Sequence, residues 1–147
     1  GIALWCDIRI VDETTVFGVF CRRWGVPMSD GTTVRLPRLI GAARALDMLI
    51  TGRGVNADEA IDWGLATRRA AKGQTRQVAE ELALQIAGFP QIAMRSDRMS
   101  AYKQAGQTME DAVRTEKELS QEAKAIEASE GAARFATGAG RHGEFSE

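Results

Sequence analysis

Asp30 is the first candidate for chemistry, because it is the only acid between residues 19 and 32. A carboxylate can take a proton from one carbon atom and return it to another. Doing so near neutral pH requires burial or an apolar wall that raises the pKa of the acid. The alternative is structural, since Ser29-Asp30-Gly31 is a common turn signature in which Asp bonds its own backbone. The sequence leaves the proton shuttle and the turn residue both open.

Cys21 is the second candidate, because two arginines follow it directly. Arg22 and Arg23 would favour the thiolate, which is the form of cysteine that acts as a base or nucleophile. The only histidine of the chain, His142, lies far away near the C-terminus. The alternative is that Cys21 lines a pocket as a small apolar residue, which is how free cysteines usually behave.

Apolar and aromatic residues surround these two candidates and could line a substrate pocket. Phe20, Trp24 and Val26 could also supply the apolar wall that a proton-shuttling carboxylate needs. The predicted substrate-binding set is Phe20, Trp24, Gly25, Val26 and Met28. Core packing is the alternative for each large side chain. The sequence contains no cluster of metal ligands and no glycine motif for phosphate, so no metal is expected.

The composition excludes several classes of protein. The 147 residues are 44% hydrophobic and carry a formal net charge of -1, which gives no basic excess for nucleic acid. No apolar run approaches the roughly 20 residues of a membrane span. The two cysteines form no disulfide framework, which fits a reducing, cytoplasmic location. Trp5 and Cys6 are expected in the core, as the end of a buried helix that runs into a strand.

Hydrophobic periodicity predicts a mixed first part and a helical second part. Residues after about 74 are expected to be helical throughout, with stops at Gly88 and Pro90. Asn56 with Glu59 three residues later predicts a helix start, and Gly64 predicts its end. The remaining predicted elements are strands at 8–11, 15–17 and 65–69, a loop at 19–32, and helices from 33 to 40 and from 43 to 50.

Several motifs together resemble one known family. They are Phe17-Gly18, Arg22-Arg23-Trp24-Gly25-Val26, the run from Asp30 to Gly41, Leu49-Ile50-Thr51-Gly52 and the run from Ala57 to Ala66. This pattern resembles the enoyl-CoA hydratase/isomerase (crotonase) family. The resemblance implies an α/β fold of the ClpP/crotonase type. Residues 1–70 would form the second half of the spiral core, and residues 71–147 an all-α C-terminal trimerisation module.

The same resemblance implies where the reaction would take place. Family members commonly carry two catalytic glutamates, and the motifs place Gly1 and Cys21 at those positions. The substrate would be an acyl-CoA thioester that reacts through an enolate, with coenzyme A carried by the substrate and no other cofactor. The backbone donors that hold the thioester oxygen would come from residues before Gly1. Hydratase activity is therefore expected to be poor, and the alternatives are a double-bond isomerase using Asp30 and a non-catalytic acyl-CoA-binding protein.

The resemblance also implies partners for this chain. Family members are about twice as long, so the chain is expected to be a fragment that lacks its N-terminal half. A homotrimer or a dimer of trimers is expected. Arg134, Phe135 and Arg141 are weak candidates for contacts with coenzyme A from a neighbouring subunit, by analogy with the family alone.

Overall fold

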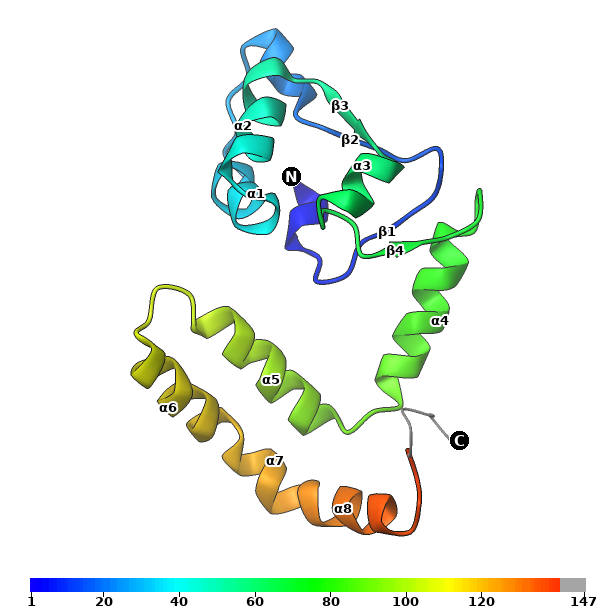
Figure 1. Cartoon of the computed structure of the whole chain (residues 1–147), viewed down its shortest axis with the longest axis vertical. Coiled ribbons are helices and arrows are strands. Elements are labelled where there is room, and N and C mark those ends of the chain that lie inside the picture. Colours follow the sequence, from blue (N-terminus) through cyan, green and yellow to red (C-terminus); the bar gives the residue numbers. More distant parts are fainter. Residues whose placement is uncertain (141–147) are drawn as a thin grey trace. The chain divides into compact units, whose positions relative to one another are not determined.

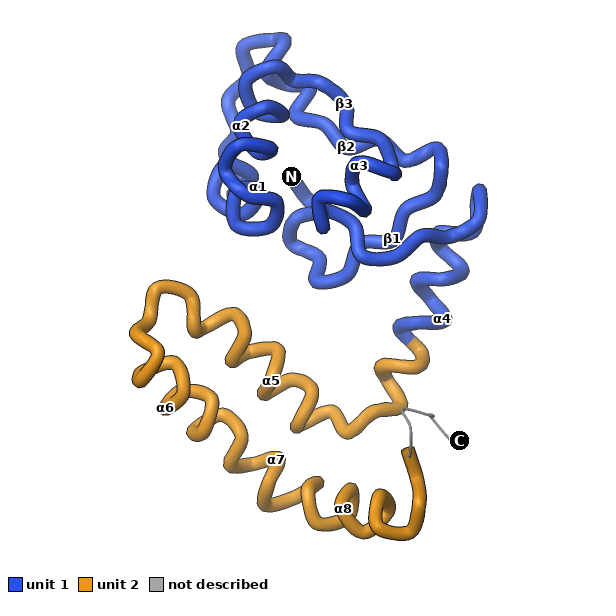
Figure 2. Tube along the Cα trace, viewed as in Figure 1, with its two compact units in different colours: residues 1–83 blue, residues 84–147 orange. Residues whose placement is uncertain are grey.

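The computed structural model of the protein describes residues 1–140 (Figure 1). The chain forms two compact units, residues 1–83 and residues 84–147 (Figure 2). The division falls inside a single helix, α4 (Thr75–Ala87), later in the chain than the boundary predicted after residue 70. The positions of Arg141 and His142 lie outside the described residues.

The first unit alternates short strands with short helices. Its elements are the 3-10 helix η1 (Ile2–Trp5), the strands β1 (Ile10–Val11) and β2 (Val16–Gly18), the 3-10 helix η2 (Phe20–Trp24), the helices α1 (Thr32–Ile40) and α2 (Ala42–Thr51), strand β3 (Gly54–Asn56), helix α3 (Ala57–Asp62) and strand β4 (Arg68–Arg69). Helix η2 occupies part of the segment predicted as a loop. The expected helices after residue 33 are confirmed, with α1 beginning one residue earlier.

The four strands pair in two separate ladders. β1 pairs with β4 in parallel, with Ile10 opposite Arg68. β2 pairs with β3 in antiparallel fashion, with Val16 opposite Asn56. The two ladders therefore differ in strand direction and do not join into one parallel sheet. Strand β3 was not predicted, because three residues that include Gly54 carry no alternating pattern.

The N-terminal segment differs from its prediction. Residues 2–5 form a single turn of 3-10 helix rather than the end of a buried α-helix. One turn of this geometry brings only Leu4 into the core, while Trp5 is 58% exposed and Cys6 is exposed. The prediction that Trp5 and Cys6 are core residues is wrong for this reason.

The local capping signals after β3 behave as predicted. The Asn56 side chain accepts a hydrogen bond from the backbone N–H of Glu59 at 2.9 Å, which begins α3. Gly64 follows the helix with a positive φ of 73° and donates its N–H to the Ile61 carbonyl. Such bonds are set by residues a few positions apart, so the sequence was sufficient to predict them.

A continuous apolar core holds the first unit together. Its members come from η1, from β1 and β3, from helices α1 to α3 and from the connecting segments. The cluster consists of Leu4, Val11, Val19, Leu36, Ile40, Ala45, Met48, Val55, Ala57, Ala60, Leu65 and Ala66. Cys21 and Met28 are partly buried and pack against this cluster.

The second unit is helical, as predicted. It contains α5 (Gln91–Lys103), α6 (Met109–Leu119), α7 (Gln121–Ile126) and α8 (Ala128–Ala136). The Glu127 carboxylate accepts hydrogen bonds from the backbone N–H groups of Ile92 and Ala93, at 3.1 and 2.8 Å, and so caps the start of α5. Ala123 is the one buried residue among those described in this unit.

Candidate active site

The candidate site is built around the turn that leads into α1. Asp30 Oδ1 accepts hydrogen bonds from the backbone N–H of Thr32 at 3.0 Å and from its hydroxyl at 2.6 Å. Gly31, which lies between Asp30 and Thr32, has a φ of +86°, a backbone conformation that favours glycine. The turn interpretation of Asp30 is therefore confirmed. The turn uses one carboxylate oxygen of Asp30, Oδ1. The role of the other oxygen, Oδ2, depends on the groups around it.

The second oxygen, Oδ2, points at Gly1. It lies 3.7 Å from the Gly1 backbone nitrogen. A Cβ atom built on Gly1 would lie 1.3 Å from Oδ2 and 2.4 Å from Cγ of Asp30. The carboxylate of Asp30 thus occupies the space of a side chain at position 1. That is one of the two positions at which the resemblance expects a catalytic glutamate.

Trp5 holds the backbone of this turn. Its indole Nε1–H donates to the Asp30 carbonyl at 2.8 Å, and a Cβ on Gly31 would come within 3.0 Å of the indole ring. The guanidinium of Arg35 lies over the same ring at 4.4 Å and donates to the Leu4 carbonyl at 2.6 Å. No local sequence pattern predicts this contact, because Trp5 lies 25 residues before Asp30.

The pKa of Asp30 is lowered from its usual value, first by the Thr32 hydroxyl and then by the Thr32 backbone N–H. Both donors stabilise the charged form. The proton-shuttle hypothesis requires a raised pKa, which is the opposite direction. Since the Asp30 side chain is also 43% exposed, desolvation is too weak to reverse the effect. Asp30 is therefore an ionised carboxylate at neutral pH.

The apolar wall expected beside Asp30 is not formed by Phe20, Trp24 and Val26. Trp24 is 81% exposed, Val26 52% and Phe20 45%, so none of them is a buried wall. The Phe20 ring instead covers two glycines, since a Cβ on Gly18 would lie 2.3 Å from a ring atom and one on Gly54 would lie 3.9 Å away.

Cys21 lies on the core side of η2. Its Sγ is 4.0 Å from Sδ of Met28, and both residues pack against the apolar cluster. The neighbouring arginines are engaged elsewhere: Arg22 Nε donates to the Leu49 carbonyl at 3.1 Å, and the Arg23 guanidinium lies 5.6 Å from the centre of the Phe20 ring. This geometry supports the apolar interpretation of Cys21 over the thiolate.

A small cavity of about 40 Å³ lies beside the turn. Its volume suits a water molecule or a small apolar group. Thr32 supplies a polar side chain to a lining that is otherwise glycine and apolar residues: Gly1, Ala3, Leu4, Phe17, Gly18, Val19, Leu36, Met48 and Leu65. The structure therefore brings Gly1, Asp30 and Thr32 together. Gly25, the remaining predicted binding residue, ends η2 with φ 71° and takes the place of a helix cap.

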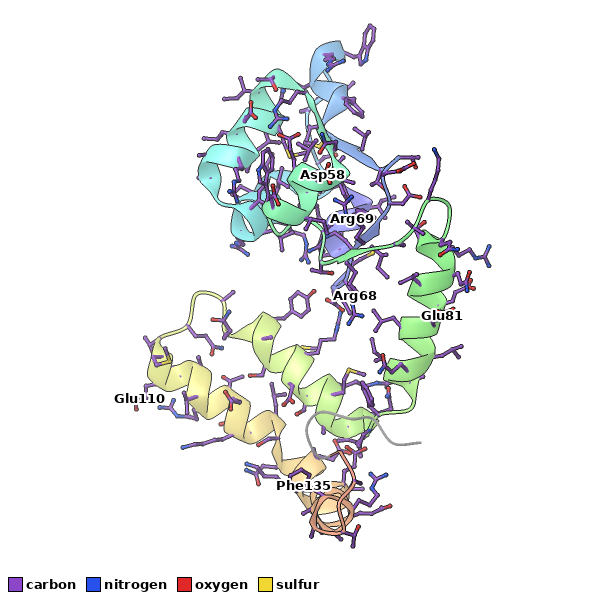
Figure 3. All side chains as sticks on the ribbon, turned by 45° about the vertical axis from the view of Figure 1, so that its right-hand side comes forward. Asp58, Arg68, Arg69, Glu81, Glu110 and Phe135 are labelled. Atoms are coloured by element: carbon purple, nitrogen blue, oxygen red, sulfur yellow. The ribbon has the colours of Figure 1, made fainter. Side chains whose placement is uncertain are left out.

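Other candidates add little to this site. Within residues 1–140 no three His, Cys, Asp or Glu side chains are grouped to hold a metal ion. Phe135 on α8 is 63% exposed (Figure 3). Among the described helices, none has the length and apolar character needed to cross a membrane. Arg69 of β4 pairs with Asp58 of α3, an exposed link that belongs to the fold rather than to the site (Figure 3).

Comparison with known proteins places this geometry in a family. The family model described as enoyl-CoA hydratase/isomerase matches residues 1–140. YngF of Bacillus subtilis (strain 168), an enoyl-CoA hydratase/isomerase by name, is 38% identical over 102 residues, 69% of this chain and 39% of YngF. The 4-chlorobenzoyl coenzyme A dehalogenase-1 of Arthrobacter sp is 30% identical over 90 residues, 61% of this chain and 33% of that protein.

Solved structures give the same result for the fold. The crystal structure of enoyl-CoA hydratase from Bacillus anthracis superposes with a TM-score of 0.84 at 29% identity, covering 91% of this chain and 52% of that one. The chain thus spans about half of this structure and less than half of the two relatives above. The family model, the relatives and the fold agree, and the chain belongs to the enoyl-CoA hydratase/isomerase family.

Proposed function

We propose that the protein acts on an enoyl-CoA thioester and moves its double bond, with Asp30 as the group that transfers the proton. The observation that carries this proposal is the position of Asp30 Oδ2 in the side-chain space of Gly1. A carboxylate reaches this position from the loop, although position 1 itself has no side chain. The relatives named above include coenzyme A thioesters in their names, which supports an acyl-CoA substrate.

The number of carboxylates favours isomerisation over hydration. Hydration takes two groups, because water must lose a proton while the α-carbon receives one. Isomerisation can proceed with one carboxylate that carries a proton between two carbons. Asp30 offers one, and Cys21 offers none while it packs against Met28. The proposed reaction therefore matches what the site contains.

The ionised state of Asp30 suits the first half of this reaction. A base must be unprotonated before it can accept a proton, and the lowered pKa keeps Asp30 in that form at neutral pH. The cost is a weaker base, since basicity falls with pKa. Two backbone N–H groups that polarise the thioester would offset part of this cost.

Binding without catalysis is the second candidate, and the same lowered pKa favours it. A carboxylate tied to Thr32 is a good turn residue and a poor base. In that case the protein would hold an acyl-CoA and leave it unchanged. The trimer, the role of Phe135 toward coenzyme A and the cytoplasmic location are common to both candidates and remain predictions.

The test compares wild type with Asp30→Asn in the full-length protein, on a panel of 2- and 3-enoyl-CoA thioesters. Asn keeps the shape and can keep the turn, so affinity should change little while the isomerisation rate falls about 10²-fold or more. Equal rates would rule out Asp30 as the proton carrier. Binding of the thioesters with no turnover in either protein would favour the non-catalytic candidate. Asp12→Asn, in a similar turn, is the matched control for effects of losing a turn carboxylate.

A further inference from the structure

We infer that Thr32 and the absence of a side chain at Gly1 together position the Asp30 carboxylate: Thr32 anchors Oδ1, and Gly1 leaves the space that Oδ2 occupies. The inference rests on the proposed function for its catalytic meaning, but its geometry is independent of that function. Thr32 and Gly1 are positioning residues here, and Asp30 is the group that would touch the substrate.

Thr32 is built for the first part of this role. It is the first residue of α1 and is 2% exposed, so its hydroxyl cannot turn freely to solvent. The short 2.6 Å contact to Oδ1 and the 3.0 Å contact from the backbone N–H fix one edge of the carboxylate. A carboxylate held by two donors on one oxygen can rotate little, which keeps its other oxygen aimed in one direction.

Gly1 is required for the second part. A Cβ at this position would overlap Oδ2 at 1.3 Å, far inside any real contact between those atoms. Any residue with a side chain here would force the Asp30 carboxylate out of its present place. A residue with a side chain at position 1 and the present placement of Asp30 are therefore mutually exclusive. The carboxylate of this site can come from the loop because position 1 has no side chain.

The surroundings hold the loop backbone rather than the carboxylate. Trp5 from η1 donates to the Asp30 carbonyl, and Arg35 from α1 lies on the Trp5 ring. The groups that the structure places against the carboxylate itself are the Gly1 nitrogen and Thr32. In the proposed step, Oδ2 takes a proton from a substrate carbon, and the electron pair of the broken C–H bond is delocalised into an enolate. The protonated Oδ2 then returns the proton to the carbon at the far end of the conjugated system, which leaves the double bond in its new position.

Thr32→Val in the full-length protein tests the anchor. The valine keeps the volume and removes only the hydroxyl. We expect the isomerisation rate to fall about 10-fold as the carboxylate loosens. The pKa of Asp30, followed by carboxyl ¹³C NMR, should rise because the Thr32 hydroxyl is the largest cause of its lowering. Thr32→Ser should restore both. Thr14→Val, which removes the equivalent 2.6 Å bond from Asp12, should leave both at the wild-type level.

Gly1→Ala tests the space. We expect the rate to fall about 10²-fold through displacement of the carboxylate, with little change in thermal unfolding. In an Asp30→Asn background the same substitution should have no further effect on the rate, since the group that it displaces is already inactive. Because Gly1→Ala leaves the core untouched, it decides the question even if Thr32→Val does not fold.

Two results would overturn the inference. One is a wild-type rate and an unchanged Asp30 pKa in Thr32→Val; the other is a wild-type rate in Gly1→Ala. If wild type turns over no thioester at all, the proposed function fails, and the NMR comparison still decides the positioning. An unchanged Asp30 signal in both variants would then reject it, and a shifted signal in both would support it.

Discussion

Two turns of the first unit have the same local design and different surroundings. Asp12-Glu13-Thr14 and Asp30-Gly31-Thr32 both place Asp two residues before Thr. In the first, Oδ1 of Asp12 accepts from the Thr14 N–H at 2.9 Å and from its hydroxyl at 2.6 Å. The matching distances in the second are 3.0 and 2.6 Å. Local chemistry alone would give the two acids the same role.

The second oxygen separates the two acids. Oδ2 of Asp12 accepts the backbone N–H of Gly73 at 2.9 Å, and Asp12 as a residue is only 5% exposed. These donors lower the pKa of Asp12 to about 2, led by the Thr14 hydroxyl. Oδ2 of Asp30 instead faces Gly1, with its side chain 43% exposed. The second oxygen of Asp12 is thus held by a backbone N–H inside the fold, whereas the second oxygen of Asp30 lies beside Gly1 on a partly exposed side chain.

The largest effect expected from this comparison concerns hydration. Asp30 is the single candidate carboxylate of the site among the described residues, so hydration of crotonyl-CoA by the full-length protein should lack at least one acid–base contribution of about 10²–10⁴. A steady-state assay beside an ordinary two-glutamate hydratase measures the difference. Equal turnover would show that Asp30 is not the sole acid of the site, and the contrast between the two turns would lose its meaning.

The next effect concerns stability. Asp12→Ala should lower Tm more than Asp30→Ala, because it leaves the N–H of Gly73 and both donors of Thr14 without their acceptor. Asp30→Ala should instead lower the isomerisation rate more. Differential scanning calorimetry should show the larger loss of Tm in Asp12→Ala, and the thioester assay should show the larger loss of rate in Asp30→Ala. A larger loss of Tm in Asp30→Ala would reverse our assignment of the two roles.

The pH dependence of stability separates the turns further. The folded pKa of Asp12 is about 2, below its ordinary 3.8. Between these values the unfolded state binds more protons than the folded one, so stability should rise with pH in that window. The stability that the lowered pKa of Asp12 contributes should be fully present above about pH 4 and lost as the pH falls through about 2. Denaturant unfolding at several pH values should show this slope in wild type and a flatter one in Asp12→Asn.

The smallest effects concern the middle residue of each turn. Gly31→Ala should cost about 1–2 kcal/mol, since alanine is strained at a φ of +86° and its Cβ would come within 3.0 Å of Trp5. Glu13→Ala should be nearly silent, because it removes only an exposed ion pair with Lys72. Urea unfolding of the two variants measures the difference. Similar costs would mean that Trp5 does not constrain the Asp30 turn.

The sequence by itself determined the local features of this protein. The turn at Asp30, the cap at Asn56 and the end of α3 at Gly64 all follow from bonds between residues two or three positions apart. The helices that follow residue 33 were set by hydrophobic spacing. The family was indicated by motifs spread from Phe17 to Ala66, and the family model confirms it.

Tertiary structure decided what the local features do. No pattern predicted that Asp30 meets Gly1, that Trp5 bonds the Asp30 carbonyl or that β2 pairs with β3 in antiparallel fashion. Each of these contacts joins residues 25 to 40 positions apart, with the strand pairing Val16 to Asn56. Their geometry depends on how the whole core packs, because a carboxylate gains its role from the groups that surround its second oxygen. The same Asp-x-Thr turn is therefore structural at Asp12 and a candidate for catalysis at Asp30.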